Sequence, residues 1–368
     1  MKKTSHPIAE QDFHIQLAQR LTDWYERCKR DLPWRKTRDP YSILISEAML
    51  QQTQVDRVVA FYERWMEKLP DFAALAAADE SSVISLWQGL GYYSRARNLL
   101  KTAQFLKSSG LTTLPADPRF LKKLPGLGPY TIGALCSIAF NMPVPAVDGN
   151  VRRVFARLLD LDVDPAKSAG AALIERHVAS VLKQGEPRVL TQAFMELGAT
   201  VCLPKTAFRC GDCPVAALCA ALKAGTQAQR PVSTRKTSIL RRQGAALLIA
   251  TPRGWLVRQR PATGLWANFY EIPWIIAEEG ESAQSALARL AGSLSIENKC
   301  RDLHVAETLK FTRWQVSVHL WQTACRNGPA GQLLQKETDE LKALPMPAGL
   351  KRLVVKALEK KQLELFDA

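Results

Sequence analysis

The 368-residue sequence has no apolar run of about 18 residues, the length that a membrane-spanning helix needs. Its first ten residues, Met1 to Glu10, also lack the apolar stretch of a signal peptide. No internal repeat or low-complexity tract is evident. We therefore predict a cytoplasmic protein with no membrane segment. At roughly 100 to 200 residues per domain, its length favours two globular domains.

Acidic residues are scarce relative to basic ones. The chain has 35 Asp plus Glu against 50 Lys plus Arg, which gives a net charge of +15 and a pI near 9.6. Such an excess of positive charge favours a polyanionic partner such as a nucleic acid. The less favoured alternative on charge alone is a merely basic soluble protein without such a partner.

Cysteines are few, but half of them are clustered. Four of the eight fall within 18 residues, at Cys202, Cys210, Cys213 and Cys219, and the others are scattered. In a reducing compartment such a cluster indicates metal ligation and not disulfides. Four thiolates can enclose an iron-sulfur centre or a tetrahedral zinc ion, and the spacing does not choose between them.

The pattern of apolar residues divides the chain into two parts. From His14 to about Ala221 they recur at helical spacing between short Pro or Gly turns, so we predict an all-helical domain over residues 1–221. Residues 222–242 lose this periodicity, gain six basic side chains and are interpreted as a linker. Beyond them we expect a mixed α and β domain over residues 243–360 and a tail over 361–368. Its predicted elements are strands at 245–250, 255–258 and 316–321 and a helix at 282–290.

A glycine-rich turn, Leu124 to Gly128, opens directly into a predicted helix. Gly126 and Gly128 permit close approach of the backbone to a ligand, and the free amides at the helix start can bind a phosphate. The same turn also occurs in ordinary helical hairpins. Twenty residues after Gly128, Asp148 stands just before an amphipathic helix, where a plain helix-capping role would suffice.

The order of these parts resembles the helix-hairpin-helix DNA glycosylase superfamily, in which such an aspartate serves the scissile sugar. The runs Leu32 to Arg35 and Ile45 to Val55 narrow the resemblance to the adenine DNA glycosylase (MutY) family. The blocks at 88–99 and 192–199 match it as well, so the resemblance covers about residues 20–220 in continuous order. It implies a base-excision repair enzyme that hydrolyses the N-glycosidic bond of adenine mispaired with 8-oxoguanine or guanine. It also implies an all-α core with a 4Fe-4S cluster loop, although the first two cysteines are separated by seven residues where the family usually has six. Zinc is the less favoured alternative.

The resemblance also assigns roles to individual residues. Glu47 matches the catalytic acid, although a glutamate on the polar face of a helix would look the same. Asp148 would stabilise or trap the sugar cation. The remaining implied roles are polar support by Tyr130 and Asn150, contact with the flipped adenine by Arg35 and Gln192, wedging of the duplex by Gln52, and stacking by Tyr92 or Tyr93.

Position 130 separates two related activities. The endonuclease III branch resembles this chain closely but carries there a lysine that attacks the sugar and cleaves the strand. A phenol cannot form a Schiff base, so Tyr130 predicts a monofunctional glycosylase. The alternatives are an oxidised-pyrimidine glycosylase of the endonuclease III type and a noncatalytic DNA-binding iron-sulfur protein.

Residues 260–273 resemble the start of the Nudix-like C-terminal domain of the same family. The glutamate-rich helix that a Nudix hydrolase needs for magnesium is missing, because the chain offers Ser285 to Leu290 there, so we expect a binding module of α+β fold. The family reads 8-oxoguanine with a Phe-Ser-His loop, and the matching place is Phe311, Thr312 and Arg313. Without the histidine, the preference for 8-oxoguanine over guanine stays open.

The tail residues Gln362 to Phe366 resemble the short bacterial motif that docks into the sliding clamp. An amphipathic end of the preceding predicted helix, Leu350 to Glu359, would give the same pattern. The expected partners are therefore double-stranded DNA with adenine mispairs and a bacterial clamp. The expected setting is a monomer in the bacterial cytoplasm, with the nucleoid.

Overall fold

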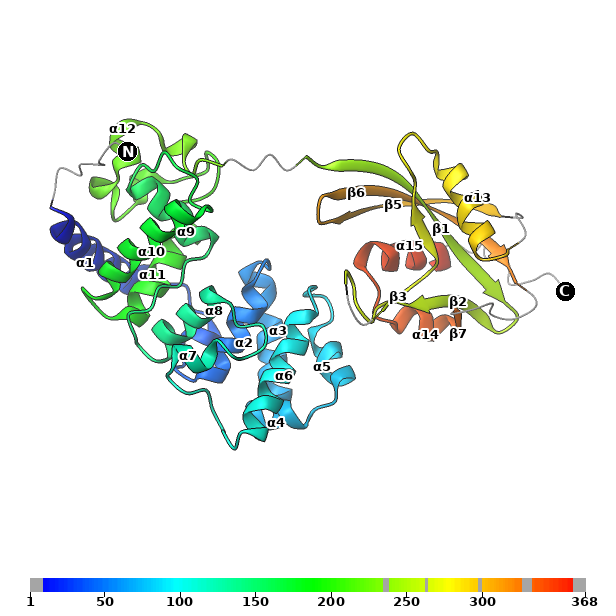
Figure 1. Cartoon of the computed structure of the whole chain (residues 1–368), viewed down its shortest axis with the longest axis horizontal. Helices are drawn as coiled ribbons and strands as arrows, with labels where there is room; N and C mark the ends of the chain where they lie inside the picture. Colours follow the sequence, from blue (N-terminus) through cyan, green and yellow to red (C-terminus); the bar gives the residue numbers. More distant parts are fainter. Residues whose placement is uncertain (1–8, 234–237, 262–263, 297–299, 326–332, 360–368) are drawn as a thin grey trace. The chain divides into compact units, whose positions relative to one another are not determined.

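The computed structural model describes residues 9–233, 238–261, 264–296, 300–325 and 333–359. It contains two compact units that divide between residues 235 and 236, one helical and one built around a sheet (Figure 1). Each has its own hydrophobic core. The predicted combination of an all-helical core with an α+β domain is confirmed.

Short helices joined by tight turns make up the first unit. Its helices are α1 (Glu10–Cys28), α2 (Pro40–Leu50), α3 (Val55–Lys68), α4 (Phe72–Ala77), α5 (Glu80–Trp87), α6 (Ser94–Ser108), α7 (Pro118–Leu121), α8 (Pro129–Ala134), α9 (Gly149–Leu158), α10 (Ser168–Leu182), α11 (Pro187–Thr200) and α12 (Ala220–Ala224). Shorter helical turns are η1 (Pro33–Arg35), η2 (Leu135–Ala139), η3 (Cys210–Asp212), η4 (Ala216–Leu218) and η5 (Gln227–Gln229). Two clusters of buried residues hold them, one over α2 to α8 and η2 and one over α1 and α9 to α12.

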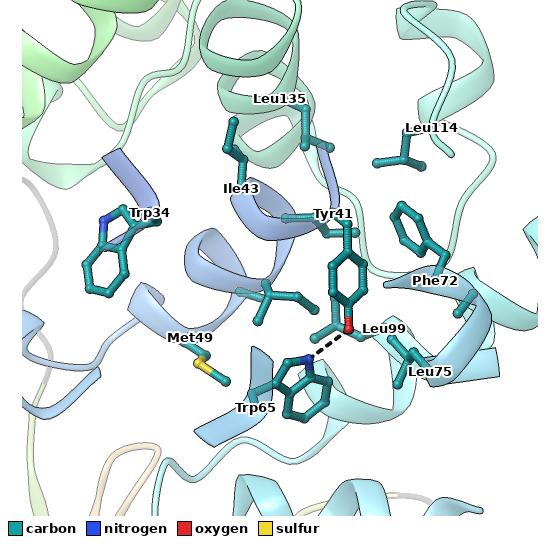
Figure 2. Packing of buried hydrophobic residues seen from close by; sticks show 14 of the residues in the cluster. Trp34, Tyr41, Ile43, Met49, Trp65, Phe72, Leu75, Leu99, Leu114 and Leu135 are labelled. Carbon is teal, nitrogen blue, oxygen red and sulfur yellow. Dashed lines mark hydrogen bonds between the residues drawn. The ribbon is translucent and has the colours of Figure 1, made fainter. Parts of the chain in front are cut away.

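Helix α2 is buried on nearly all sides, which explains its apolar sequence. Asp39 caps it by accepting bonds from the amides of Tyr41 and Ser42, and Pro40 occupies its first turn. The Tyr41 hydroxyl donates to the Leu69 carbonyl oxygen at 2.5 Å. It also accepts from Trp65 Nε1 at 3.0 Å, the bond drawn in Figure 2. The core therefore fixes the helix that carries Glu47.

A mixed sheet with helices on its faces forms the second unit. Its elements are β1 (Leu240–Thr251), β2 (Gly254–Gln259), β3 (Tyr270–Glu271), β4 (Trp274–Ile276), α13 (Ala283–Ser293), β5 (Arg301–Phe311), β6 (Trp314–Ala324), β7 (Leu333–Lys336), α14 (Thr338–Ala343) and α15 (Ala348–Glu359). The strand order is β3-β2-β1-β6-β5, with β4 on β1 and β7 on β2, and β1 and β6 run parallel from Leu240 opposite Trp314. Helix α15 belongs to the hydrophobic core on one face of the sheet, and helix α13 belongs to the core on the other face.

The segment predicted as a linker, 222–242, is mostly folded. Leu222 packs on the second helical cluster, and Arg157 donates to the carbonyl oxygens of Gln227 and Arg230. Residues 240–242 already belong to β1. The division between the two units, between residues 235 and 236, falls inside this predicted segment. The polar and basic composition of this segment gave no indication that it is folded, because backbone carbonyl groups make the contacts and their interactions cannot be predicted from composition.

None of the described helices combines the length and apolar character needed to cross a membrane.

Candidate active site

A cavity of about 460 Å³ opens in the helical unit. Its walls come from η1, the C-terminal half of α2, the start of α8, the start of α9 and one face of α11. These segments are far apart in the sequence, and together they bring seven of the predicted site residues into one place. The lining includes Arg35, Glu47, Gln52, Tyr130, Asp148, Asn150 and Gln192.

Glu47 lies on α2 and is only 5% exposed. The Tyr130 hydroxyl donates to its Oε2 at 2.5 Å. Burial raises the pKa of Glu47 to about 7, the nearby Asp148 adds to the rise, and the Tyr130 bond and Arg35 oppose it. A carboxyl group with this pKa carries a proton in a large share of molecules at neutral pH and can deliver it as an acid.

Asp148 is the N-cap of α9, as its position in the sequence predicted. Its Oδ1 accepts from the Val151 amide at 2.7 Å and its Oδ2 from Asn150 Nδ2 at 3.1 Å. Burial raises the pKa of Asp148, and these bonds to the carboxylate limit the rise. Both the bonds and the helix N-terminus favour its charged form, which suits a group facing a developing cation.

A buried charge cluster closes another wall of the cavity. Glu196 is 1% exposed and pairs with Arg30 at 2.6 Å and with Arg35 at 2.7 Å. Burial alone would raise the pKa of Glu196, but the bonds from both arginines outweigh it and lower the pKa to about 2. Gln192 lies one turn earlier on α11, and its Oε1 accepts from the Tyr25 hydroxyl at 3.1 Å. The wall thus presents an amide, a guanidinium and a carboxylate, all suited to a heterocyclic base.

Two exposed residues with left-handed backbone lie near the end of α2. Gln52 has φ 59° and lines the cavity, while Tyr92 has φ 47° and is 63% exposed. Tyr93 is half-buried, and its hydroxyl accepts a long 3.4 Å bond from the Gly89 amide. Both left-handed residues sit in turns that place a polar or aromatic side chain at the surface.

Arg95 joins these two turns. Its Nη1 donates to the carbonyl oxygens of Ala48, Met49 and Gln51 at 2.6 to 3.1 Å, and its Nη2 to those of Leu90 and Gly91 at 3.1 and 2.9 Å. The guanidinium also lies over the Trp87 ring, 5.2 Å from its centroid. Burial lowers the pKa of Arg95 to about 10, so the group remains charged at neutral pH. The sequence did not mark this role, since its acceptors are all backbone atoms.

The glycine-rich turn leads into α8, as predicted. Gly126 has φ 77°, and a Cβ added there would lie 2.5 Å from the Asn98 side chain. Gly128 is the N-cap of α8, and both glycines are exposed next to Lys122 and Lys123. Only glycine fits this turn at position 126, and its backbone is open to a ligand.

All four clustered cysteines line a second, apolar cavity of about 30 Å³. Among the described residues, no three of these thiols bring their sulfur atoms within 4.8 Å of one another. A tetrahedral zinc ion with Zn–S bonds of about 2.3 Å needs sulfur atoms about 3.8 Å apart. The wider spacing of the sulfur atoms suits a larger inorganic centre.

Arg157 organises the cysteine loop, a role that the sequence did not reveal. It is buried, and it donates to Cys202 Sγ at 3.3 Å, the Leu203 carbonyl oxygen at 2.8 Å and the Lys205 carbonyl oxygen at 3.0 Å. Lys205 has φ 56°, so the seven-residue spacing between the first two cysteines is accommodated by a left-handed turn. Burial raises the pKa of Cys213 to about 12, as expected for a thiol held among other thiols.

Hydrogen bonds connect this loop with Asp148. Arg153 donates from Nε to the Cys202 carbonyl oxygen at 2.8 Å and from Nη2 to Asn150 Oδ1 at 2.9 Å. Asn150 in turn donates to Asp148. The order of the cysteine loop therefore influences the position of the Asp148 carboxylate.

In the second unit, the turn between β5 and β6 carries the predicted recognition residues. Thr312, with φ 48°, and Arg313 are exposed at its tip. Phe311 is half-buried and its ring packs edge-on against Trp266 at 4.9 Å between centroids. The aromatic ring thus anchors the turn and leaves a hydroxyl and a guanidinium facing solvent.

Comparison with protein-family models divides the chain in the same way. Residues 45–179 match the model described as HhH-GPD superfamily base excision DNA repair protein, and residues 245–356 match the NUDIX domain.

Among curated proteins, the chain is 32% identical to the adenine DNA glycosylase of Mus musculus over 84% of this chain and 72% of that protein. It is 30% identical to that of Buchnera aphidicola subsp. Baizongia pistaciae, over 71% of this chain and 74% of the relative. The human adenine DNA glycosylase is 40% identical over 57% of this chain, and the match spans 40% of its length.

Solved structures resemble the helical unit. A thermostable thymine-DNA glycosylase superposes with a TM-score of 0.54 and 25% identity, covering 59% of this chain and all of that one. A trapped endonuclease III-DNA covalent intermediate has a TM-score of 0.50 and 24% identity, covering 59% of this chain and 99% of that one, and so shares the fold.

Proposed function

The chain belongs to the adenine DNA glycosylase family, and we propose that it hydrolyses the N-glycosidic bond of adenine mispaired with 8-oxoguanine or guanine in base-excision repair. The observation that carries this proposal is the buried Glu47, with a pKa raised to about 7 and a hydrogen bond from Tyr130, in the same cavity as Asp148. A neutral carboxylic acid and a carboxylate in one site are the two groups that glycosidic cleavage needs.

In the proposed reaction, Glu47 delivers a proton to the adenine ring, at N7 in the family, because an adenine anion is a poor leaving group. The sugar then becomes an oxocarbenium-like cation. Asp148, held by Asn150 and the Val151 amide, stabilises or traps it. Water completes the hydrolysis.

Tyr130 supports a monofunctional enzyme. A strand-cleaving glycosylase of the endonuclease III type needs an amine that attacks the sugar. Of the described residues that line the cavity, none is a lysine. We propose that strand breaks arise only from later chemical or enzymatic treatment of the abasic site.

The adenine must leave the base stack to reach Glu47. We propose that Arg35 and Gln192 contact the flipped base, that Gln52 wedges into the gap, and that Tyr92 stacks on a neighbouring base. Exposure supports Tyr92 over Tyr93 for stacking. The turn with Gly126 and Gly128 would contact the phosphate backbone, helped by the exposed Lys122 and Lys123.

In the second unit, Phe311, Thr312 and Arg313 are proposed to contact the base opposite the adenine. The exposed Thr312 hydroxyl can donate or accept a hydrogen bond, and the exposed Arg313 guanidinium can donate several, so together they can bind the edge of a purine base. No glutamate occurs on α13, which supports a binding role for this Nudix-like unit.

We propose that Cys202, Cys210, Cys213 and Cys219 hold a 4Fe-4S cluster. The separation of their sulfur atoms supports this centre over zinc. When bound, the cluster would brace the loop that carries Lys205 and Arg209 toward DNA phosphates, and it takes no part in the hydrolysis.

The clamp motif at Gln362 to Phe366 lies outside the described residues, and clamp binding remains a proposal based on sequence. We further propose that the enzyme acts as a monomer with the bacterial nucleoid, where its substrate is located. The bacterial relatives support this setting.

The decisive experiment uses duplexes that place adenine opposite 8-oxoguanine, guanine or thymine, and one duplex with an oxidised pyrimidine. We expect adenine release from the first two only, with strand breaks appearing mainly after alkali. E47Q should slow release by about 10²- to 10⁴-fold while retaining DNA binding. The exposed Glu63 on α3 provides the control variant E63Q. Release of the oxidised pyrimidine instead of adenine would establish the endonuclease III-type activity, and a full rate in E47Q would refute the assigned acid.

A further inference from the structure

A second group of ligand-type side chains lies at the start of α1, outside both cavities described above. Glu10 and His14 are four residues apart on this helix and therefore lie on the same face. His177 of α10 faces them. One ligand atom from each of these three residues lies within 4.8 Å of the other two.

The two imidazoles are in direct contact. His14 Nε2 and His177 Nδ1 are 2.9 Å apart. The rings are only 4% and 7% exposed, and the Phe13 ring packs against both, at 5.6 and 6.4 Å between centroids. A hydrogen bond between two neutral imidazoles uses one ring as donor and the other as acceptor, so a proton lies between two nitrogen atoms that are both suited to ligation.

The hydrogen bond between the rings requires at least one of them to be neutral, because a protonated imidazole has no acceptor nitrogen. Neutral imidazole is the form that binds metal ions. Arg176 lies 3.6 Å from the Glu10 carboxylate, but both side chains are more than half exposed, so this pair costs little to separate.

We propose that Glu10, His14 and His177 form a binding site for one zinc ion. Zinc takes imidazole nitrogen atoms at about 2.0 to 2.1 Å in a tetrahedral arrangement, which places two such nitrogen atoms about 3.3 Å apart. The observed pair needs to open by only about 0.4 Å for the ion to replace the shared proton. Glu10 is exposed and gives the ion access from solvent, and water fills the fourth position. Two nitrogen ligands with one carboxylate suit zinc better than calcium or magnesium, which prefer oxygen ligands alone.

A zinc ion here would connect α1 with α10. Both helices belong to the core cluster that surrounds α9 and α11, and α1 carries Tyr25, the donor to Gln192. The ion would therefore stabilise the half of the helical unit that contains the cysteine loop. This role is independent of base release.

The test is a calorimetric titration of the full-length protein with zinc chloride, after the cysteine cluster has been loaded and without chelating buffers. We expect one site in the wild type. E10Q should weaken binding by at least the roughly 10- to 100-fold that loss of an outer-shell partner costs, and H177Q should abolish it. The control is D12N, which removes the same charge from an exposed neighbour on α1.

Thermal unfolding gives a second readout that does not depend on the folding of H177Q. Zinc should raise the unfolding temperature of wild type and D12N but not that of E10Q. The proposal is overturned if the wild type binds no zinc, or if E10Q binds zinc with the affinity of D12N.

Discussion

At the scale of single residues, the cavity contains Glu47 and Asp148 in different environments, besides Glu196, which is paired with two arginines. Glu47 is buried against Tyr130, whereas Asp148 receives hydrogen bonds from Val151 and Asn150. Different environments allow one group to keep its proton and the other to lose it. The proposed activity depends on this difference, and its pH dependence follows from it.

Base release should decline as the pH rises through about 7, because the pKa of Glu47 is about 7 and only its protonated form can act as the acid. The Tyr130 bond lowers that pKa, so Y130F should move the decline to higher pH. Single-turnover rates of adenine release between pH 5 and 9 would measure both effects. If the rate of Y130F declined at the same pH as that of the wild type, the inferred effect of the Tyr130 hydrogen bond on the pKa of Glu47 would be contradicted.

The same burial should reduce stability. The folded pKa of Glu47 lies above the ordinary value of 4.5, so the protein binds the proton more tightly when folded, and stability falls as the pH rises from about 4.5 through 7. E47Q removes this loss, which is on the order of 3 kcal/mol above pH 7. We expect E47Q to be more stable than wild type in urea unfolding at pH 8 and much closer to it at pH 5. If the stability difference between E47Q and wild type were the same at the two pH values, that result would argue against a buried, titrating Glu47.

At the scale of helices and turns, the site depends on close packing between α9 and α11. A Cβ added to Gly198 of α11 would lie 2.5 Å from Asn150 Cβ and 3.2 Å from the Asn150 backbone. Asn150 is the residue that joins Asp148 to Arg153. The contact leaves no room for adjustment at either helix.

We therefore expect G198A to lower both the free energy of unfolding, by about 1 to 3 kcal/mol, and the rate of base release, since Asn150 must move. In G292A on α13, an added Cβ meets nothing within 4 Å, and the same substitution should be neutral or stabilise by up to about 1 kcal/mol. Urea unfolding and single-turnover rates distinguish the two variants. Wild-type behaviour of G198A would show that the helices can separate freely.

Arg95 performs a comparable task for two turns. A lysine can donate at most three hydrogen bonds, whereas the two Nη atoms of Arg95 alone donate to five carbonyl oxygens. R95K should leave some of these carbonyl acceptors without a hydrogen bond, which should lower the free energy of unfolding by about 1 to 3 kcal/mol. It should also weaken DNA binding, because Gln52 and Tyr92 lose their fixed positions. Fluorescence anisotropy with mismatched duplex would measure the binding. R64K, at an exposed position on α3, is the control and should bind normally.

At the scale of the whole molecule, the net charge of +15 predicts binding that depends strongly on salt. Each phosphate neutralised by a lysine contributes about 0.9 to the slope of log affinity against log salt concentration. If Lys122 and Lys123 contact phosphates beside the glycine-rich turn, the double variant K122Q/K123Q should reduce this slope by up to about 2. Its rate of base release at saturating enzyme should be unchanged.

Anisotropy titrations between roughly 50 and 200 mM salt, the range over which such effects are large, would determine the slope. K183Q, an exposed lysine at the end of α10, is the control. A slope unaffected by the double variant would place the phosphate contacts elsewhere.

The sequence by itself determined the two-part architecture, and it predicted the hairpin and the main candidate site residues. Helical and strand periods are local properties, and the runs around Glu47, Tyr130 and Asp148 carry a family pattern that the comparisons support. The cysteine spacing likewise indicated an inorganic centre. These features can be predicted from the sequence because they depend on residues that are neighbours in the chain.

Only the tertiary structure decided what surrounds these residues. The pairing of Glu196 with Arg30 and Arg35, the five carbonyl acceptors of Arg95, the bonds of Arg157 to the cysteine loop and the contact of His14 with His177 all join segments distant in sequence. The packing of residues 222–233 onto the helical unit belongs to the same class. Composition and spacing report a side chain's type but neither its burial nor the backbone atoms it meets, and those determine pKa, strain and ligand geometry.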